Sequence, residues 1–138
     1  EGRPVRWGIL GCGMISRDFV SAALALDAHE STVVACAARK VESAAAFAKQ
    51  FEGTAVAGSM RSYGSYDELL ADAEVDVVYV GTLAETHEEL CLKAVVAKKH
   101  VLVEKPITLN AEGARRVTAA AREQGLFLME GMWTRCFP

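Results

Sequence analysis

The sequence lacks any apolar run long enough to span a membrane. Its first hydrophobic stretch, Trp7 to Leu10, is followed at once by Gly11 and Gly13, so it also lacks the core of a signal peptide. The formal net charge is −3, and there is no excess of positive charge that would attract nucleic acid or anionic lipid. We therefore expect a cytoplasmic protein that binds neither nucleic acid nor membrane.

Cysteines and histidines in metal-ligand spacing are lacking too. The four cysteines, Cys12, Cys36, Cys91 and Cys136, contain no C-x-x-C pair, and the three histidines are scattered along the chain. We expect no metal site. We expect the cysteines to serve as small buried hydrophobic residues.

What is present is the composition of one globular domain, and we assign residues 1–138 to it. The 138 residues are 51% hydrophobic and 24% charged, which is an ordinary balance for a packed core under a solvated surface. No internal repeat or linker is visible. The chain begins at Glu1 without a methionine and ends directly after an apolar run, so we expect it to be a piece of something longer.

Short β-rich segments alternate with segments of helical periodicity. The predicted strands are Val5–Leu10, Thr32–Ala38, Arg61–Tyr63, Val75–Val80, Val101–Val103 and Leu126–Met129. The helical stripes between them include Ile15, Phe19, Ala22 and Leu26; Ala44, Phe47, Ala48 and Phe51; Leu90, Cys91, Ala94 and Val95; and Ala114, Val117 and Ala121. This alternation predicts an α/β fold, a doubly wound (Rossmann), mostly parallel sheet of about six strands.

Local signals mark where some of these helices begin and end. Ser65 with Glu68 three residues later is a capping-box pattern for a short helix. Asn110 can cap the last helix, and Gly125 can end it.

A glycine loop, Gly11-Cys12-Gly13, connects the first strand to the first helix, where dinucleotide-binding domains carry G-x-G-x-x-G/A. The first glycine permits the tight turn, and the second lets the backbone approach a pyrophosphate at the helix N-terminus. Ser16 occupies the third position, which needs a small residue. Two alternatives stay open at this point: a tight turn without a ligand, and the glycine loop of a methyltransferase.

The second predicted strand ends in Arg39 and Lys40, with no carboxylate to bind the ribose hydroxyls of NAD. A guanidinium and an ammonium suit the 2′-phosphate of NADP, because arginine meets phosphate oxygens with paired donors. The missing acid also argues against a methyltransferase. The alternative is that both residues are simply solvated loop charges.

The chain resembles the glucose–fructose oxidoreductase and inositol dehydrogenase (Gfo/Idh/MocA) family over nearly its whole length. The resemblance rests on the glycine loop, the run Val75–Val80 leading into Gly81, Thr82 and then His87, the sixth strand, and above all Glu104-Lys105-Pro106. Ala37-Ala38-Arg39, residues 125–130 and Trp133-Thr134-Arg135 are further similar to the dimeric dihydrodiol dehydrogenase branch, which includes NADP-linked D-xylose 1-dehydrogenases. Cys136 stands where that branch would have a second aromatic residue.

The resemblance implies a role for each matching position. It assigns contacts with the cofactor, NADP rather than NAD, to Gly11, Gly13, Met14, Ile15, Arg39, Lys40, Thr82, Leu83, His87 and Glu104. Lys105 would be the catalytic residue that helps remove the proton of the substrate hydroxyl, and Trp133 and Arg135 would line the substrate pocket. From residue type alone, however, Lys105 is one lysine in a loop, and His87 can equally pack or cap the helix that follows it.

The resemblance further implies a parent NADP-dependent dehydrogenase acting on a small sugar or cyclic trans-diol. Family members continue into a second domain, which supplies further acid–base residues and usually a homo-oligomer interface, so we expect this chain alone to be inactive. The alternative is a non-catalytic NAD(P)-sensing module, against which Lys105 at the reaction centre argues.

Overall fold

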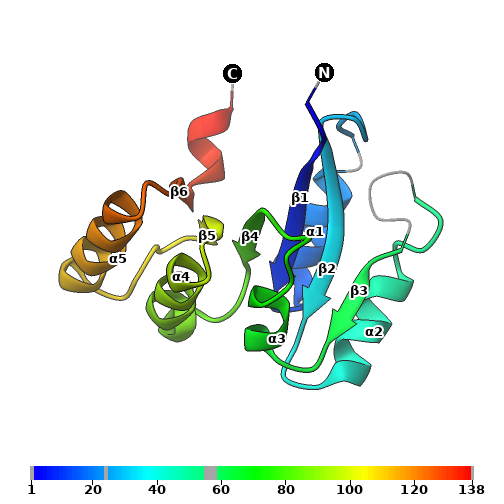
Figure 1. Ribbon diagram of the computed structural model, residues 1–138, viewed down its shortest axis with the longest axis horizontal. Helices are drawn as coiled ribbons and strands as arrows, with labels where there is room; N and C mark the ends of the chain where they lie inside the picture. The colour runs from blue at the N-terminus through cyan, green and yellow to red at the C-terminus, as the bar shows by residue number, and fades with distance from the viewer. Residues whose placement is uncertain (1, 24, 55–58, 138) are drawn as a thin grey trace.

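The computed structural model describes residues 2–23, 25–54 and 59–137, which form a six-stranded sheet of order β3-β2-β1-β4-β5-β6 (Figure 1). Each neighbouring pair of strands is parallel. The predicted fold class, a doubly wound α/β sheet of six strands, is confirmed.

Strands and helices alternate along the chain. The strands are β1 (Val5–Leu10), β2 (Ser31–Ala37), β3 (Arg61–Tyr63), β4 (Val77–Val80), β5 (His100–Glu104) and β6 (Leu128–Gly131). The helices are α1 (Met14–Ala23), α2 (Val41–Lys49), α3 (Tyr66–Leu70), α4 (His87–Val96) and α5 (Ala111–Glu123). Two short 3-10 turns, η1 (Ala84–Thr86) and η2 (Trp133–Cys136), follow β4 and β6.

Helices cover the sheet on both faces, as parallel strands this apolar require. On one face, buried residues of α3, α4 and α5, such as Leu69, Leu90 and Val117, pack on the strands. On the other, α1 and α2 pack through residues such as Val20 and Phe47. The central strand β4 is buried along its whole length, so its residues alternate between these two cores.

The order of the strands reverses at the centre of the sheet. From β1 the chain winds outward through β2 to β3, and it then returns to the other side of β1 and continues through β4 and β5 to β6. The loops that leave the carboxyl ends of β1 and β4 therefore run to opposite sides. Such a switch point leaves a crevice at the carboxyl edge, where open α/β sheets bind ligands.

Several predicted element bounds differ from the observed ones; the stripe of the second helix, for example, runs to Phe51, whereas α2 ends at Lys49. The stripe of the first helix does not reach Leu26, because α1 ends at Ala23 and Leu26 is exposed. The fourth strand pairs from Val77, not Val75. The sixth strand begins at Leu128, not Leu126. Gly125, with φ +66°, ends α5, and the Leu126 amide donates to Ala121 O in the last turn of that helix, so Leu126 belongs to the helix cap rather than to the strand.

The predicted helix caps are present. Ser65 Oγ accepts from the Glu68 amide at 3.2 Å, while the Glu68 carboxylate accepts from the amide of Gly64 rather than Ser65, so this capping box is displaced by one residue. Asn110 Oδ1 accepts from the Gly113 amide at 2.8 Å and begins α5.

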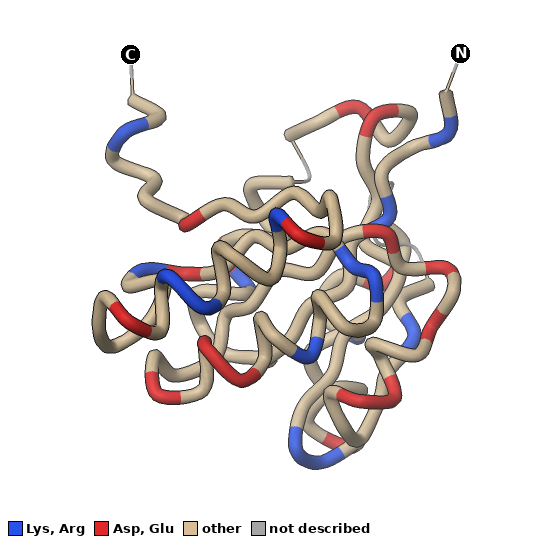
Figure 2. Tube along the Cα trace, turned by 60° about the vertical axis from the view of Figure 1, so that its left-hand side comes forward, with Lys and Arg blue, Asp and Glu red and all other residues tan. Residues whose placement is uncertain are grey.

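Acidic and basic residues are interspersed along the chain (Figure 2). The most connected charge is Asp76, whose carboxylate accepts hydrogen bonds from the side chains of Arg3 and Arg6 and from the Arg6 amide. These bonds tie the start of β1 to the start of β4. Among the residues described, no helix combines the length and apolar character needed to cross a bilayer.

Two cysteines depart from the expectation of burial. Cys36 and Cys91 are buried as predicted, but Cys136 is exposed and Cys12 is half-buried. Cys136 lies in η2 after the last strand, and Cys12 lies in the glycine loop between β1 and α1. Neither cysteine therefore lies in the layer between the sheet and its helices.

Candidate functional site

The glycine loop makes the tight turn that its sequence predicts. Gly11 has φ +92°, and its amide donates to Ala37 O on the neighbouring strand at 3.0 Å. A Cβ at Gly11 would lie 2.7 Å from Thr82 Cγ2, so a side chain is excluded by both conformation and space. At Gly13, by contrast, a Cβ would meet no heavy atom within 4 Å, so the loop faces open space in front of the N-terminus of α1.

Ser16, the third position of the fingerprint, is completely buried at the first turn of α1. A side chain at Gly81 would collide with Ser16 Oγ, so α1 and the end of β4 approach as closely as two small residues permit. Ser16 Oγ is the only buried side-chain oxygen or nitrogen without a hydrogen-bond partner among the described residues.

A cleft of about 500 Å³ opens at the switch point between the loops that follow β1 and β4. Its lining consists of Gly11, Gly13, Met14, Ile15, Arg39, Tyr66, Gly81, Thr82, Leu83 and Thr86. Three of these residues, Met14, Ile15 and Leu83, expose apolar side chains to it. The cleft therefore combines backbone amides at a helix N-terminus with apolar walls, as sites for organic phosphate cofactors do.

A second cleft, of about 620 Å³, adjoins the first at the end of β2. Arg39 and Tyr66 line both clefts, and Lys40 lines only the second. Arg39 and Lys40 are exposed, and Lys40 is the N-cap residue of α2. Burial raises the pKa of Tyr66, against the opposing effect of the nearby Arg39 charge.

Lys105 lies in a turn directly after β5, and other side chains hold this turn in place. His87 Nδ1 lies 2.8 Å from Pro106 O, and Glu130 Oε1 accepts from the Ile107 amide at 2.8 Å. Glu104 Oε2 accepts from the Lys105 amide at 3.2 Å, and the peptide bond between Lys105 and Pro106 is cis. The Lys105 side chain itself is exposed.

His87 is buried and does not line the cleft. Its Nε2 lies 3.2 Å from Thr82 O, so its two ring nitrogens face carbonyl oxygens of the loops after β4 and β5. The imidazole thus connects the loop that carries Thr82 and Leu83 to the turn that carries Lys105. In this position His87 holds the backbone of both loops.

Glu104 is likewise held inside the structure. Its Oε1 accepts from the Tyr79 hydroxyl at 2.8 Å, and the Tyr79 ring stacks on Phe19 with centroids 4.0 Å apart. Burial, together with the Glu104 carboxylate, raises the pKa of Tyr79 far above its ordinary value, so Tyr79 remains a hydrogen-bond donor. This chain of contacts connects α1, β4 and β5 beneath the site.

Trp133 and Arg135 lie in η2 after β6, outside both clefts. Trp133 is 53% exposed and makes an edge contact with Phe137 at a centroid distance of 5.5 Å. Arg135 is also exposed.

The structure thus brings together only part of the predicted site. The residues that share the first cleft are Gly11, Gly13, Met14, Ile15, Arg39, Thr82 and Leu83. Sequence reasoning missed Tyr66, Thr86, Tyr79 and Glu130. Tyr66 was within reach of a sequence argument, since it follows the third strand and its helix cap and so must lie at the same carboxyl edge.

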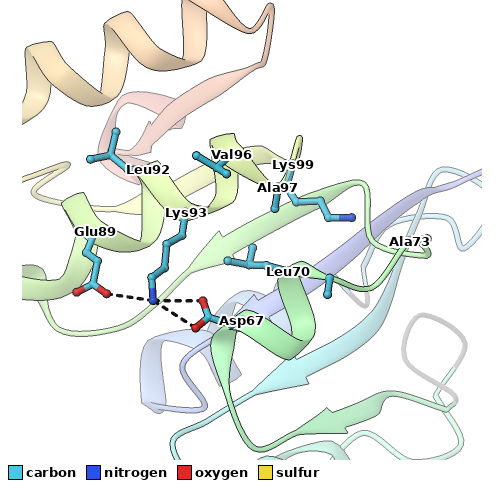
Figure 3. Close-up of a pocket in the computed structure, with 10 residues that line it drawn as sticks. Asp67, Leu70, Ala73, Glu89, Leu92, Lys93, Val96, Ala97 and Lys99 are labelled. Atoms are coloured by element: carbon cyan, nitrogen blue, oxygen red, sulfur yellow. Dashed lines mark hydrogen bonds and ion pairs between the residues drawn. The ribbon is translucent and has the colours of Figure 1, made fainter.

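A larger hollow than either cleft lies elsewhere, between α3 and α4 (Figure 3). Its volume is about 770 Å³, and apolar side chains such as Leu70, Leu92 and Val96 form much of its wall. Lys93 at its rim pairs with Asp67 and Glu89, each at 3.2 Å. It includes no residue of the glycine loop and does not lie at the carboxyl edge of the sheet, so we do not place the site there.

Comparisons with known proteins agree with this geometry. The family described as oxidoreductases with an NAD-binding Rossmann fold (GFO_IDH_MocA) matches residues 5–132. The trans-1,2-dihydrobenzene-1,2-diol dehydrogenases of Danio rerio and Bos taurus are 45% and 43% identical over 134 residues. These matches cover 97% of this chain but 38% of each relative, so the chain spans well under half their length.

Solved structures show the same relationship. The 3-ketoreductase KijD10 from Actinomadura kijaniata, in complex with NADP and TDP-benzene, superimposes with a TM-score of 0.82 at 36% identity, over 94% of this chain and 37% of that one. An NAD-binding oxidoreductase from Klebsiella pneumoniae gives 0.81 at 26% identity, over 93% and 34%. The predicted family is confirmed: this chain belongs to the Gfo/Idh/MocA oxidoreductases and corresponds to their NAD(P)-binding Rossmann domain.

Proposed function

We propose that this chain binds NADP in preference to NAD, as the cofactor-binding part of an oxidoreductase that oxidises a hydroxyl of a sugar or cyclic trans-diol. The observation that carries the cofactor proposal is the pair of adjoining clefts that share Arg39. One cleft begins at the glycine loop and the other contains Lys40, so the central pyrophosphate and the 2′-phosphate of NADP would each meet a suitable group.

The residues present fit such a cofactor. The open space in front of Gly13 leaves room for a pyrophosphate against the amides at the start of α1. At the end of β2, the exposed Arg39 and Lys40 stand where NAD-selective domains carry an acid. Paired guanidinium donors suit the additional phosphate of NADP.

The chemistry of the parent reaction would fall mainly to Lys105. NADP, when bound, supplies a hydride acceptor. Lys105 helps to remove the hydroxyl proton of the substrate, and the side chains of His87, Glu104 and Glu130 fix the turn from which it acts. Trp133 and Arg135 would form one wall of the substrate pocket, and residues beyond this chain would supply the other wall, the second acid–base group and a homo-oligomer interface.

The substrate class is supported by names rather than by pocket geometry. Relatives are named dihydrodiol dehydrogenases, and a structural neighbour is a 3-ketoreductase in complex with NADP. Both names describe enzymes that interconvert a hydroxyl group and a carbonyl group.

The cofactor proposal is tested by titrating NADP and NAD against the wild-type chain and Arg39→Ala. We expect wild type to prefer NADP, and we expect the substitution to cost about 1–3 kcal/mol of NADP binding, the scale of a lost charged hydrogen bond, with NAD binding almost unchanged. Arg115→Ala is the matched control, because Arg115 is exposed on α5 and lines neither cleft. Equal affinity of the wild type for the two cofactors would refute the preference.

A further inference from the structure

The three tyrosines of the chain differ in what their hydroxyl groups bind. Tyr63 donates to Asp72 Oδ2 at 3.0 Å, and Tyr79 donates to Glu104 Oε1 at 2.8 Å. No hydrogen bond joins the Tyr66 hydroxyl to any other described residue. Because a half-buried tyrosine usually finds a partner for its O–H group, the Tyr66 hydroxyl is free to bind a ligand.

The pairing of β2 with β3 brings Tyr66 to the same edge of the sheet as Arg39. The two strands run in parallel, with Ala37 opposite Tyr63, and the Ala38 amide donates to Tyr63 O at 3.2 Å. Arg39 and Tyr66 each follow within a few residues of this pair, so both lie at the carboxyl edge. Both residues line the two adjoining clefts of the candidate site.

Packing holds the Tyr66 ring in place. Tyr66 is the first residue of α3, and its half-buried side chain packs against the core that contains Leu69 and Leu70. The ring therefore loses little further freedom when its hydroxyl binds a ligand. Since burial raises the pKa of Tyr66, this hydroxyl keeps its proton at neutral pH and acts as a donor.

The second cleft, which adjoins the glycine loop at the end of β2, suits an anion. Its lining contains no carboxylate, and its polar side chains can all donate hydrogen bonds; these are Arg39, Lys40, Ser43 and Tyr66. The two acidic residues that follow Tyr66 on α3 have partners of their own. Glu68 accepts from the Gly64 amide at 3.1 Å, and Asp67 pairs with Lys93 at 3.2 Å.

We propose that Tyr66 is a specificity-determining residue, whose hydroxyl donates a hydrogen bond to the 2′-phosphate of NADP beside Arg39. NAD carries a neutral ribose hydroxyl in place of this phosphate. A hydrogen bond to an anion is stronger than one between neutral groups, so the Tyr66 hydroxyl adds to the preference for NADP. The inference rests on the proposed function, to which it adds a neutral donor that the second predicted strand does not supply.

Tyr66→Phe tests the inference, because it removes the hydroxyl group and keeps the ring. NADP and NAD are titrated against the wild-type chain and the variant. We expect NADP affinity to fall about tenfold and NAD affinity to stay within about twofold. We expect urea unfolding to be unchanged, since no described residue loses a hydrogen bond.

Tyr63→Phe is the matched control, because it removes the hydroxyl of a tyrosine that lines neither cleft and is bonded to Asp72. We expect the opposite pair of results for this variant. The urea midpoint of unfolding should fall, and the affinities for NADP and NAD should both stay within about twofold of wild type.

The ³¹P resonance of the 2′-phosphate in bound NADP, followed against pH, gives a second measurement. Hydrogen-bond donors stabilise the dianion, so the pKa of this phosphate should be lower in the complex than in free NADP. In the complex with Tyr66→Phe, the same pKa should move back toward the value of free NADP.

Two results with Tyr66→Phe would overturn the inference and leave the proposed function standing. One is NADP binding equal to that of wild type. The other is an equal loss of NADP and NAD affinity, which would place the hydroxyl against a part that both cofactors share. If the wild-type chain binds NADP no more tightly than NAD, the proposed preference is wrong, and the role of Tyr66 in it is wrong as well.

Discussion

Gly11 and Gly13 should respond in opposite ways to the same substitution. Both belong to the fingerprint, yet a Cβ at Gly11 would lie 2.7 Å from Thr82 Cγ2 and 3.1 Å from Gly81 O, whereas a Cβ at Gly13 meets nothing within 4 Å. Gly11 also has φ +92°, which side chains rarely adopt. We therefore expect Gly11→Ala to damage the fold and Gly13→Ala to damage cofactor binding alone.

The magnitudes follow from these surroundings. At Gly11, the strained backbone costs about 1–3 kcal/mol, and contact with backbone atoms of Gly81 adds to it, so we expect a loss of about 2–4 kcal/mol in the free energy of unfolding. The carbonyl oxygen of Gly13 accepts from the Arg17 amide at 3.1 Å at the start of α1. Alanine is a poorer residue at this helix N-terminus, so Gly13→Ala should lower the free energy of unfolding by only about 0.5–1 kcal/mol. Bound cofactor would, however, approach the backbone at Gly13, so a methyl group there should weaken NADP binding by about tenfold and valine should abolish it.

Urea unfolding followed by circular dichroism measures the first quantity, and titration with NADP measures the second. Gly53→Ala is a useful control, because Gly53 also has positive φ (+79°), a Cβ there would meet no heavy atom within 4 Å, and Gly53 lines neither cleft. The reasoning is refuted if Gly13→Val folds and binds NADP as the wild type does. It is refuted equally if Gly11→Ala is as stable as Gly13→Ala.

Three further predictions address the surroundings of the site. His87→Phe keeps an aromatic ring but removes the ring N–H that faces the carbonyl oxygens of Thr82 and Pro106. It should therefore lower the free energy of unfolding in urea by about 1–3 kcal/mol, and an unchanged value would show that the imidazole does not hold the two loops. Hydrogen bonds from Arg6 and Arg3 hold the pKa of Asp76 well below its ordinary value, so the stability that the carboxylate adds is complete above the unfolded-state pKa and is lost as pH falls. Asp76→Asn should therefore lower the free energy of unfolding by about 2 kcal/mol at neutral pH, and the difference from wild type should disappear in acid. A difference that does not depend on pH would contradict this assignment. Residues 1–138 alone should bind NADP but form no NADPH with xylose or a cyclic trans-diol, and robust turnover by this chain would show that the catalytic residues are misplaced. In a chimaera, in which residues 1–138 replace the matching part of a full-length dihydrodiol dehydrogenase, Lys105→Met should lower kcat about a hundredfold and leave NADP affinity intact.

Much of the fold was predictable because its determinants are local in sequence. The apolar strands, the glycine loop after the first of them and the caps at Ser65 and Asn110 each rest on residues within one or two turns. Alternation of strands and helices then restricts the topology to parallel pairing through right-handed crossovers. These two facts predict a parallel, doubly wound sheet but not its strand order, because such sheets occur in more than one order.

The parts that escaped prediction depend on contacts between distant residues. Tyr79 and Glu104 are 25 residues apart, and neither has a local pattern that announces their hydrogen bond. Similarly, His87 and Pro106 meet across two strands, which decides that the imidazole is buried rather than directed into the cleft. The start of β6 was misplaced because an apolar residue, Leu126, closes the preceding helix instead of extending the strand.

The central claim is that NADP binds at the carboxyl edge of the sheet, across the loops after β1, β2 and β4. Backbone amide chemical shifts of the isotope-labelled chain, followed during a titration with NADP, test it most directly. We predict that the largest changes occur at Gly11, Gly13, Arg39 and Thr82, and that NAD gives smaller changes at Arg39. Changes confined to the groove between α3 and α4, or no changes at saturating NADP, would contradict the account.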